Sequence, residues 1–301
     1  MHVSEKNCVT SQSEKLYTLM QAMIFAAGMG TRLRPLTDTM PKALVTVNGK
    51  PLIEHVIEKL RSAGFGSIVI NVHHFAGQII DYLKEHDFEV DIKISDESDK
   101  LLDTGGGLRK AAPLFRQDEQ ILIHNVDILS NADLDTLYNK GPLMTNWGTG
   151  GTMHAAATLL VSWRKTKRYL LFDEAMRLIG WTNIETGEVK SPFRWLREFG
   201  AEHPEKFKTL QDHHDNITVE HRLLGYGKAR LQAYAFSGIH VISPKLIADR
   251  MSKYPDVFPI MDFYLDNCNT SLIKGFIQPE PKLELLDVGK PDTLKQANQH
   301  A

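Results

Sequence analysis

Short apolar segments alternate with amphipathic segments over residues 21–126, and this alternation restricts the fold more than any other feature of the chain. Apolar residues recur at helical spacing over residues 51–63, whereas residues 67–72 are mostly apolar without that spacing, which is typical of a buried strand. Strands that alternate with helices predict a mostly parallel sheet with crossover helices. The expected strands are 21–27, 67–72, 90–95 and 120–126, and the expected helices are 51–63, 77–84 and 105–114.

The second half of the chain has a different pattern, with several strands in succession before the first of three late helices. We expect strands at 155–162, 168–173, 178–182, 231–242, 272–277 and 283–288, helices at 245–251, 261–268 and 291–299, and loops at 141–151 and 200–216. Residues 1–20 are polar and without period, so we expect them to lie outside the fold. Residues 21–301 are expected to form one domain with halves at 21–140 and 141–301.

Composition excludes several classes of protein. A formal net charge of -2 argues against general electrostatic binding to nucleic acid or to an anionic membrane. The two cysteines, Cys8 and Cys268, lie far apart and form neither a zinc motif nor a disulfide framework. No apolar run of about 18 residues and no secretion signal is found, so a cytoplasmic protein is expected.

A loop rich in glycine and basic residues follows the first expected strand. Gly28 and Gly30 would let backbone N–H groups approach a phosphate chain without an intervening Cβ. Arg32 and Arg34 add donors that can bind phosphate in bidentate fashion, and Lys42 adds a compact charge. A short Gly-x-Gly turn alone is more often a simple connection, but these basic residues favour a polyphosphate site.

Two better-known phosphate loops do not match this segment. A dinucleotide-binding fingerprint would need a third glycine where Leu33 stands, and a Walker loop would end in Gly-Lys-Ser/Thr, which this loop lacks. The loop therefore belongs to neither class.

Two further motifs follow expected strands. Residues 103–107 read Asp-Thr-Gly-Gly-Gly at the start of a helix, where free N–H donors or a simple helix cap are both plausible uses. Asp127 ends a buried strand, where a carboxylate can hold Mg²⁺ or cap the next element. Ligands of parallel sheets bind outside the carboxyl ends of the strands, where the Gly28 loop, residues 71–74 and Asp127 are all expected.

Residues 23–51 resemble the signature of the sugar-phosphate nucleotidyltransferase family, AAGxGTRLxPLT followed by PKxLxxVxGKPLI, at every fixed position. The likeness continues through Asp127 and recurs in Leu286-Asp287-Val288-Gly289. The resemblance implies an α/β fold of the Rossmann-like, three-layer α/β/α type with a mixed sheet, and no β-helix repeat follows Val288. It also implies a Mg²⁺-dependent enzyme that joins an NTP to a sugar 1-phosphate, with pyrophosphate as the second product.

The resemblance also assigns residues to roles. Catalytic roles would fall to Arg32, Lys42 and Asp127, and the metal ligands would be Asp127 and Asp287. The nucleotide would be held by Ala27, Gly28, Gly30, Thr31, Arg32, Lys42, Thr104, Gly105 and Gly106. The sugar would be held by Asn125, Gly238 and Asp103.

The chain departs from the family pattern at four places. Asp103 replaces the usual glutamate, Val126 a frequent glycine, and Lys290 the usual threonine. The Glu-Lys-Pro segment whose lysine often meets the sugar phosphate is absent. Lys165, Lys167 and Arg168 are candidate substitutes, although a solvated basic run is the more common use of such residues.

Several alternatives remain open from the sequence. A metal-dependent glycosyltransferase and a non-catalytic nucleotide-sugar binder also use such sites, and one branch of the family acts on phosphorylated alcohols such as choline phosphate. A compact chain without a β-helix resembles both the N-acetylmuramic acid 1-phosphate uridylyltransferases and the short mannose-1-phosphate guanylyltransferases, and residues 168–173 and 180–183 resemble the former group more.

Overall fold

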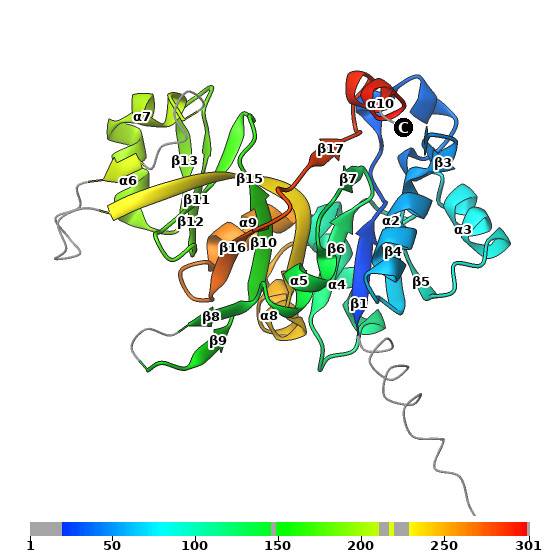
Figure 1. Ribbon diagram of the computed structural model, residues 1–301, viewed down its shortest axis with the longest axis horizontal. Coiled ribbons are helices and arrows are strands. Elements are labelled where there is room, and N and C mark those ends of the chain that lie inside the picture. The colour runs from blue at the N-terminus through cyan, green and yellow to red at the C-terminus, as the bar shows by residue number, and fades with distance from the viewer. Residues whose placement is uncertain (1–19, 146–148, 211–216, 220–228, 300–301) are drawn as a thin grey trace, which may run out of the picture.

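The structure is a computed structural model that describes residues 20–145, 149–210, 217–219 and 229–299. Its centre is a mixed sheet of eleven strands (Figure 1). These are β1 (Gln21–Phe25), β4 (Ser67–Val72), β5 (Asp91–Asp96), β6 (Ile121–Asn125), β10 (Ala157–Ser162), β11 (Arg168–Phe172), β12 (Leu178–Asn183), β13 (Glu188–Lys190), β14 (Ile217–Val219), β15 (Ala229–Ile242) and β16 (Ile273–Ile277). The strand order is β13-β12-β11-β15-β6-β1-β4-β5, with β10 and β14 on β15 and β16 on β10.

The first half of the chain forms the parallel part of this sheet. β1 pairs in parallel with β4 and β6, and β4 pairs in parallel with β5. Side chains alternate along β1, so that Ala22 and Ile24 face one core cluster while Met23 and Phe25 face the other. The carboxyl ends of these four strands therefore meet at one edge of the sheet, as the alternating sequence pattern predicted.

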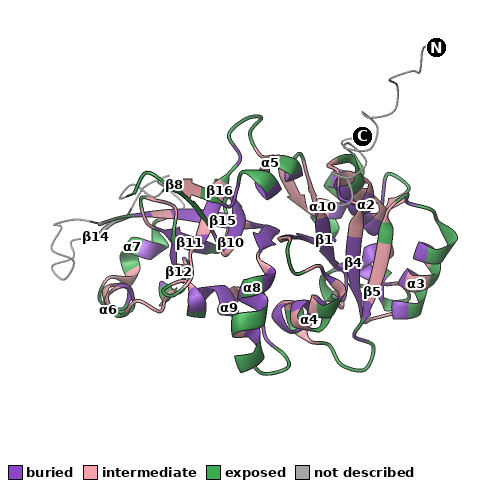
Figure 2. Ribbon diagram, turned by 90° about the horizontal axis from the view of Figure 1, so that it is seen from below, coloured by how far each residue is buried: buried purple, intermediate pink, exposed green. Residues whose placement is uncertain are grey.

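Helices cover both faces of the sheet (Figure 2). One core cluster includes α2 (Leu52–Ser62), α3 (Ala76–Glu85), α5 (Leu134–Asn139) and α10 (Pro291–Ala297). The cluster on the other face includes α4 (Asp103–Ala111), α8 (Pro244–Arg250) and α9 (Ile260–Asn267). The expected three-layer mixed α/β fold is confirmed.

The long strand β15 joins the two halves of the sheet (Figure 1). Its end pairs antiparallel with both β6 and β10, and its earlier residues Gln232, Ala233 and Tyr234 pair with β11. A third core cluster lies where α6 (Arg194–Glu202) and α7 (Pro204–Lys208) pack on β11 and β15 through Leu196 and Phe207.

Two segments expected to be loops contain regular structure. Within 200–216, α6 runs to Glu202 and α7 follows. Gly200 lies inside α6 and does not mark a loop; it is a glycine because a Cβ at this position would stand 2.6 Å from Val189 Cγ2. Within 141–151, β8 (Leu143–Thr145) pairs with β9 (Thr152–His154) just beyond it, and both strands are too short and exposed to show a pattern. Residues 1–19, 146–148 and 211–216 lie outside the described residues.

The late strand expected at 283–288 is shorter and lies outside the main sheet. β17 (Leu285–Asp287) pairs antiparallel with β7 (Ile128–Ser130), which directly follows β6. This small sheet returns the C-terminal part of the chain to the carboxyl edge of the parallel strands (Figure 1).

Glycines bring the start of α4 against the segment that precedes α9. The N–H groups of Gly105 and Gly106 both donate to the Phe258 carbonyl, at 2.9 and 3.3 Å. A Cβ at Gly105 would stand 2.3 Å from the Phe258 ring, and one at Gly106 would stand 2.1 Å from the Asp256 carbonyl oxygen. These two residues are glycine because the backbones are in close contact.

A buried polar relay connects the end of β1 with the start of α4. The Ala26 N–H donates to Asn71 Oδ1 at 2.8 Å, and Asn71 Nδ2 donates to Glu97 Oε1 at 2.7 Å. Glu97 Oε2 then accepts from the Leu102 N–H at 3.3 Å, and Gly107 leaves room for the carboxylate. Glu97 and Asn71 are both buried, so the relay holds the carboxyl ends of β1, β4 and β5 in fixed relation.

The glycine contact predicts a stability difference between two alanine variants. Gly106→Ala is expected to lower the free energy of unfolding by about 1–3 kcal/mol, because its Cβ has no room beside Asp256. Gly77→Ala, at an exposed position of α3 with no atom within 4 Å of the new Cβ, is the matched control and should be neutral or stabilising. Urea denaturation measures both, and equal effects would contradict the close-packing account.

The relay predicts a pH-dependent stability term. Burial raises the pKa of the Glu97 carboxyl above its ordinary value of 4.5, while hydrogen bonds from Asn71 and Leu102 oppose the shift. Between 4.5 and the raised value the folded state binds more protons than the unfolded chain, so the contribution of this group to stability falls as the pH rises. We expect the unfolding free energy of the wild type minus that of Glu97→Gln to decrease through this interval and then level off. Denaturation series at several pH values measure the difference, and a constant difference would disprove the assignment.

Candidate functional site

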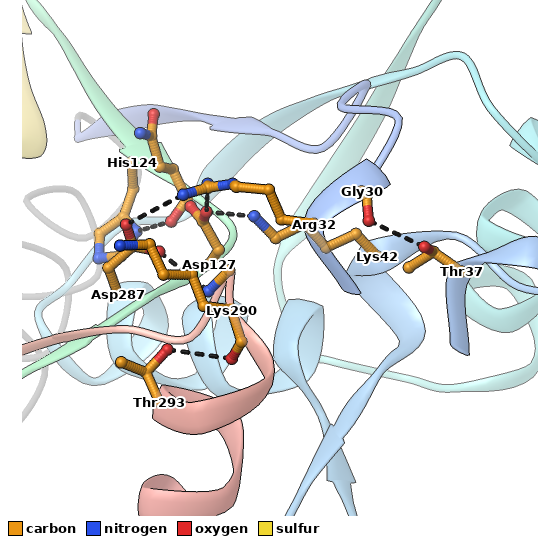
Figure 3. Close-up of polar contacts among 11 residues, drawn as sticks. Gly30, Arg32, Thr37, Lys42, His124, Asp127, Asp287, Lys290 and Thr293 are labelled. Carbon is orange, nitrogen blue, oxygen red and sulfur yellow. Dashed lines mark hydrogen bonds and ion pairs between the residues drawn. The ribbon is translucent and has the colours of Figure 1, made fainter. Parts of the chain in front are cut away.

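The loop after β1 folds back on itself through three short 3-10 helices, η1 (Thr31–Leu33), η2 (Leu36–Asp38) and η3 (Lys42–Leu44). Gly30 has φ of 64°, a conformation that other residues rarely adopt, and its carbonyl accepts a hydrogen bond from the Thr37 hydroxyl at 2.8 Å (Figure 3). Gly28 is exposed and a Cβ there would have no neighbour within 4 Å. Gly30 thus shapes the loop, while the backbone at Gly28 is open to a ligand.

Two aspartates distant in sequence lie side by side at this edge of the sheet. Asp127 follows β6 directly, and Asp287 ends β17 opposite Ile128 of β7. The Val288 N–H donates to the Asp127 carbonyl at 2.9 Å, and the Gly289 N–H donates to Asp287 Oδ1 at 2.9 Å. The β7–β17 pairing therefore brings together the two residues predicted as metal ligands.

Two cations of the glycine loop join this acidic pair (Figure 3). The Arg32 guanidinium lies 3.9 Å from both the Asp127 and the Asp287 carboxylates, and the Lys42 ammonium donates to the Asp127 carboxylate. The side chains of Lys42 and Asp127 are only 11% and 14% exposed, whereas that of Arg32 is 54% exposed. The inner pair is therefore held firmly, and the outer cation is accessible to an anion from solvent.

A cleft of about 560 Å³ opens between the parallel strands and the second half of the sheet. Asn125, at the end of β6, lines it, and Gly238 lies against Asn125, because a Cβ at Gly238 would stand 2.9 Å from Asn125 Nδ2. Gly238 has φ of 76° at a point where the register of β15 with β10 shifts, so it forms a bulge. The structure thus places two of the three predicted sugar-binding residues together at the cleft.

The third predicted sugar-binding residue, Asp103, is exposed at the start of α4, and its carboxylate accepts from the Thr104 N–H at 2.6 Å. Thr104 lines the cleft, and its hydroxyl accepts from the Ile260 N–H at 2.9 Å. The expectation of free N–H donors at Gly105 and Gly106 is wrong in this structure, because the Phe258 carbonyl takes both donors. Their part in nucleotide binding stays a prediction that the geometry does not favour.

The three basic residues predicted as substitutes for the absent lysine lie in different surroundings. Arg168 lines the cleft, Lys167 pairs with Glu185 at 2.7 Å, and Lys165 is exposed. Arg164, which the sequence analysis did not select, also lines the cleft. It belongs to the same basic run, and only the direction in which the chain leaves β10 distinguishes it from its neighbours.

Two buried histidines, His124 and His240, were also not selected by the sequence analysis. His240 lines the cleft, yet neither of its ring nitrogens has a hydrogen-bond partner among the described residues, and the same holds for His124 Nε2. Burial lowers the pKa of His240 to about 3 and that of His124 to about 4. Both rings are therefore neutral near pH 7 and contribute polar atoms without charge.

Comparisons with known proteins show what the chain is similar to. A family model described as nucleotidyl transferase matches residues 21–142. An N-acetylmuramate alpha-1-phosphate uridylyltransferase of Caulobacter vibrioides is 42% identical over 109 residues, which cover 35% of this chain and 45% of that relative. A choline-phosphate cytidylyltransferase of Streptococcus pneumoniae is 58% identical over 66 residues, which cover 22% of this chain and 28% of that relative. The chain thus spans less than half the length of these two curated relatives.

The fold as a whole is similar to that of HddC from Yersinia pseudotuberculosis, crystallised with GMP-PN. The TM-score is 0.62 at 18% identity, with 93% of this chain and 99% of that chain covered, which at this identity shows a shared fold. Within the described residues, none of the helices has both the length and the apolar character needed to cross a membrane. The resemblance seen in the sequence is confirmed over residues 21–142, which match the nucleotidyl transferase family.

Proposed function

We propose that the protein joins a nucleoside triphosphate to a sugar 1-phosphate and releases pyrophosphate. The cluster of Arg32, Lys42, Asp127 and Asp287 carries this proposal, because it combines two cations on an open glycine loop with two adjacent carboxylates. A triphosphate and a divalent metal ion require these charges. The family of residues 21–142 supports the same reaction class.

Mg²⁺ is the proposed cofactor, with Asp127 and Asp287 as its protein ligands. Two hard carboxylate ligands suit Mg²⁺, which usually keeps water and phosphate oxygens in its remaining positions. Among the described residues no group of three or more His, Cys, Asp and Glu side chains forms a complete metal cage, so the pair fits a metal ion that arrives with the nucleotide. Bound there, Mg²⁺ would neutralise and orient the phosphate oxygens.

The reaction needs charge stabilisation and positioning rather than proton transfer. An oxygen of the acceptor phosphate attacks the α-phosphorus, a new P–O bond forms, and the bond to the bridging oxygen of the β-phosphate breaks with loss of pyrophosphate. The attacking oxygen is already anionic, so no general base is required. Arg32 and Lys42 would exchange their carboxylate partners for phosphate oxygens and stabilise the charge that develops on the leaving pyrophosphate.

The relatives suggest which substrates to test first. UTP with N-acetylmuramic acid 1-phosphate is the leading pair, since the Caulobacter relative carries that name, and GTP with mannose 1-phosphate is the second. CTP with choline phosphate is a distinct candidate, supported by 58% identity over the 66 residues shared with the Streptococcus relative. Such reactions draw on nucleotide pools of the cytoplasm, where we propose that the protein acts, without nucleic acid or membrane as a partner.

The ion cluster argues against the two remaining alternatives. A glycosyltransferase that takes a finished nucleotide sugar would not require the cationic loop beside the two aspartates. A non-catalytic binder would have no need to keep Arg32 in reach of both carboxylates.

A pyrophosphate-release screen tests the proposed reaction. The four common NTPs are each combined with N-acetylmuramic acid 1-phosphate, mannose 1-phosphate, glucose 1-phosphate and choline phosphate, with Mg²⁺ or with EDTA. We expect release with one sugar 1-phosphate and loss of that release with EDTA. Preference for choline phosphate would replace the sugar 1-phosphate proposal with the choline phosphate candidate, and no pyrophosphate release with any pair would refute both proposals.

Asp127→Asn tests the role of the acidic pair. The variant removes the carboxylate shared by Lys42 and Arg32, and we expect turnover to fall roughly 1000-fold or more, since a metal-ion ligand contributes several kcal/mol to the transition state. Asp292→Asn, at an exposed carboxylate in the first turn of α10, is the control and should keep its activity. A folded Asp127→Asn protein with near-normal turnover would show that Asp127 has no catalytic role.

A further inference from the structure

Arg164 lines the cleft beside the candidate active site. It follows the end of β10 by two residues and lines the cleft together with Asn125 and Phe236. One of its terminal nitrogens, Nη2, donates to the Phe236 carbonyl at 2.7 Å, beside the bulge at Gly238. This hydrogen bond holds the guanidinium in a defined position and leaves most of its five N–H donors available.

Among the described residues Arg164 forms no ion pair, in contrast to the other two cations of the site. Arg32 and Lys42 are both paired with the aspartates, whereas no acidic side chain of the described residues forms an ion pair with Arg164. Desolvation by the surrounding protein lowers the pKa of the Arg164 guanidinium, and the Asp287 carboxylate acts in the opposite direction. Arg164 is therefore influenced by the charge of Asp287 without forming an ion pair with it.

We propose that Arg164 binds the phosphate group of the acceptor substrate at the boundary between the acidic pair and the cleft. The inference rests on the proposed function, because it names the group that holds the second substrate of that reaction. A phosphate monoester brings up to two negative charges, and arginine can bind two of its oxygens at once. The attacking oxygen would then lie next to Asp287, while the rest of the acceptor extends into the cleft.

Neighbouring cations do not share this geometry. Lys165 is exposed, as Arg164 is, but it does not line the cleft, and Lys167 is paired with Glu185. Arg168 lines the cleft, but it lies on β11 opposite Asn183, in the wall formed by β11 and β12. Lys165 is thus a matched control that carries the same charge one residue away.

The test compares Arg164→Gln, Arg164→Lys and Lys165→Gln with the wild type. Calorimetry measures the binding of four probes to each protein: N-acetylmuramic acid 1-phosphate, mannose 1-phosphate, choline phosphate and inorganic phosphate. We expect the tightest-binding probe to lose roughly 10- to 100-fold in affinity in Arg164→Gln, because a charge-assisted hydrogen-bond pair is removed. Arg164→Lys should lose less, Lys165→Gln should stay within about twofold, and thermal unfolding confirms that each variant is folded.

Three outcomes would overturn the inference. These are unchanged probe affinity in Arg164→Gln, equal losses in Arg164→Gln and Lys165→Gln, and no binding of any probe to the wild type at about 10 mM. Steady-state kinetics separate this inference from the proposed function. If the wild type releases pyrophosphate and Arg164→Gln raises the KM for the acceptor but not for the NTP, the proposed function and the role of Arg164 are both supported. If the wild type releases none but the phosphate probes bind through Arg164, the proposed reaction fails and the anion site remains.

Discussion

The antiparallel pairing of β7 with β17 is the contact on which the candidate site depends. β7 leaves the parallel sheet immediately after Asp127, and β17 returns from the far end of the chain with Asp287 at its last position. The hydrogen bond from the Val288 N–H to the Asp127 carbonyl fixes the two backbones beside each other. The following helix α10 packs Leu294 and Ala297 into the same core cluster as α2, so burial of apolar surface holds this late segment in place.

The charges gathered by that pairing are mutually dependent. Lys42 and Asp127 are almost removed from solvent, so each would leave a costly unpaired charge if the other were lost. Arg32 is more exposed and reaches both carboxylates without being enclosed. Binding of a triphosphate and a metal ion would therefore exchange partners within an existing set of charges, which requires less reorganisation than assembling the site from separate groups.

Glycine has two different uses in this protein, and they are easily confused in a sequence. At Gly30 the left-handed backbone and the closeness of Thr37 shape the loop beside the ion cluster. At Gly105 and Gly106 the missing side chain allows α4 to approach Asp256 and Phe258, and the N–H groups are consumed by that contact. A run of glycines at the start of a helix thus indicates a close approach of another group, which here is another part of the same chain.

The sequence by itself determined the parallel half of the sheet, the helices on it and the glycine-rich basic loop after β1, because each rests on local periodicity or on a continuous motif such as residues 26–37. It also indicated Asp127 and Asp287 separately, through resemblance, but no local rule pairs residues so far apart. Only the tertiary structure brought them together with Arg32, selected Arg164 rather than Lys165 from one basic run, and joined Asn71 to Glu97 in a buried relay. These contacts depend on strand order and on the direction in which each chain segment leaves its strand, and neither is encoded in the spacing of apolar residues.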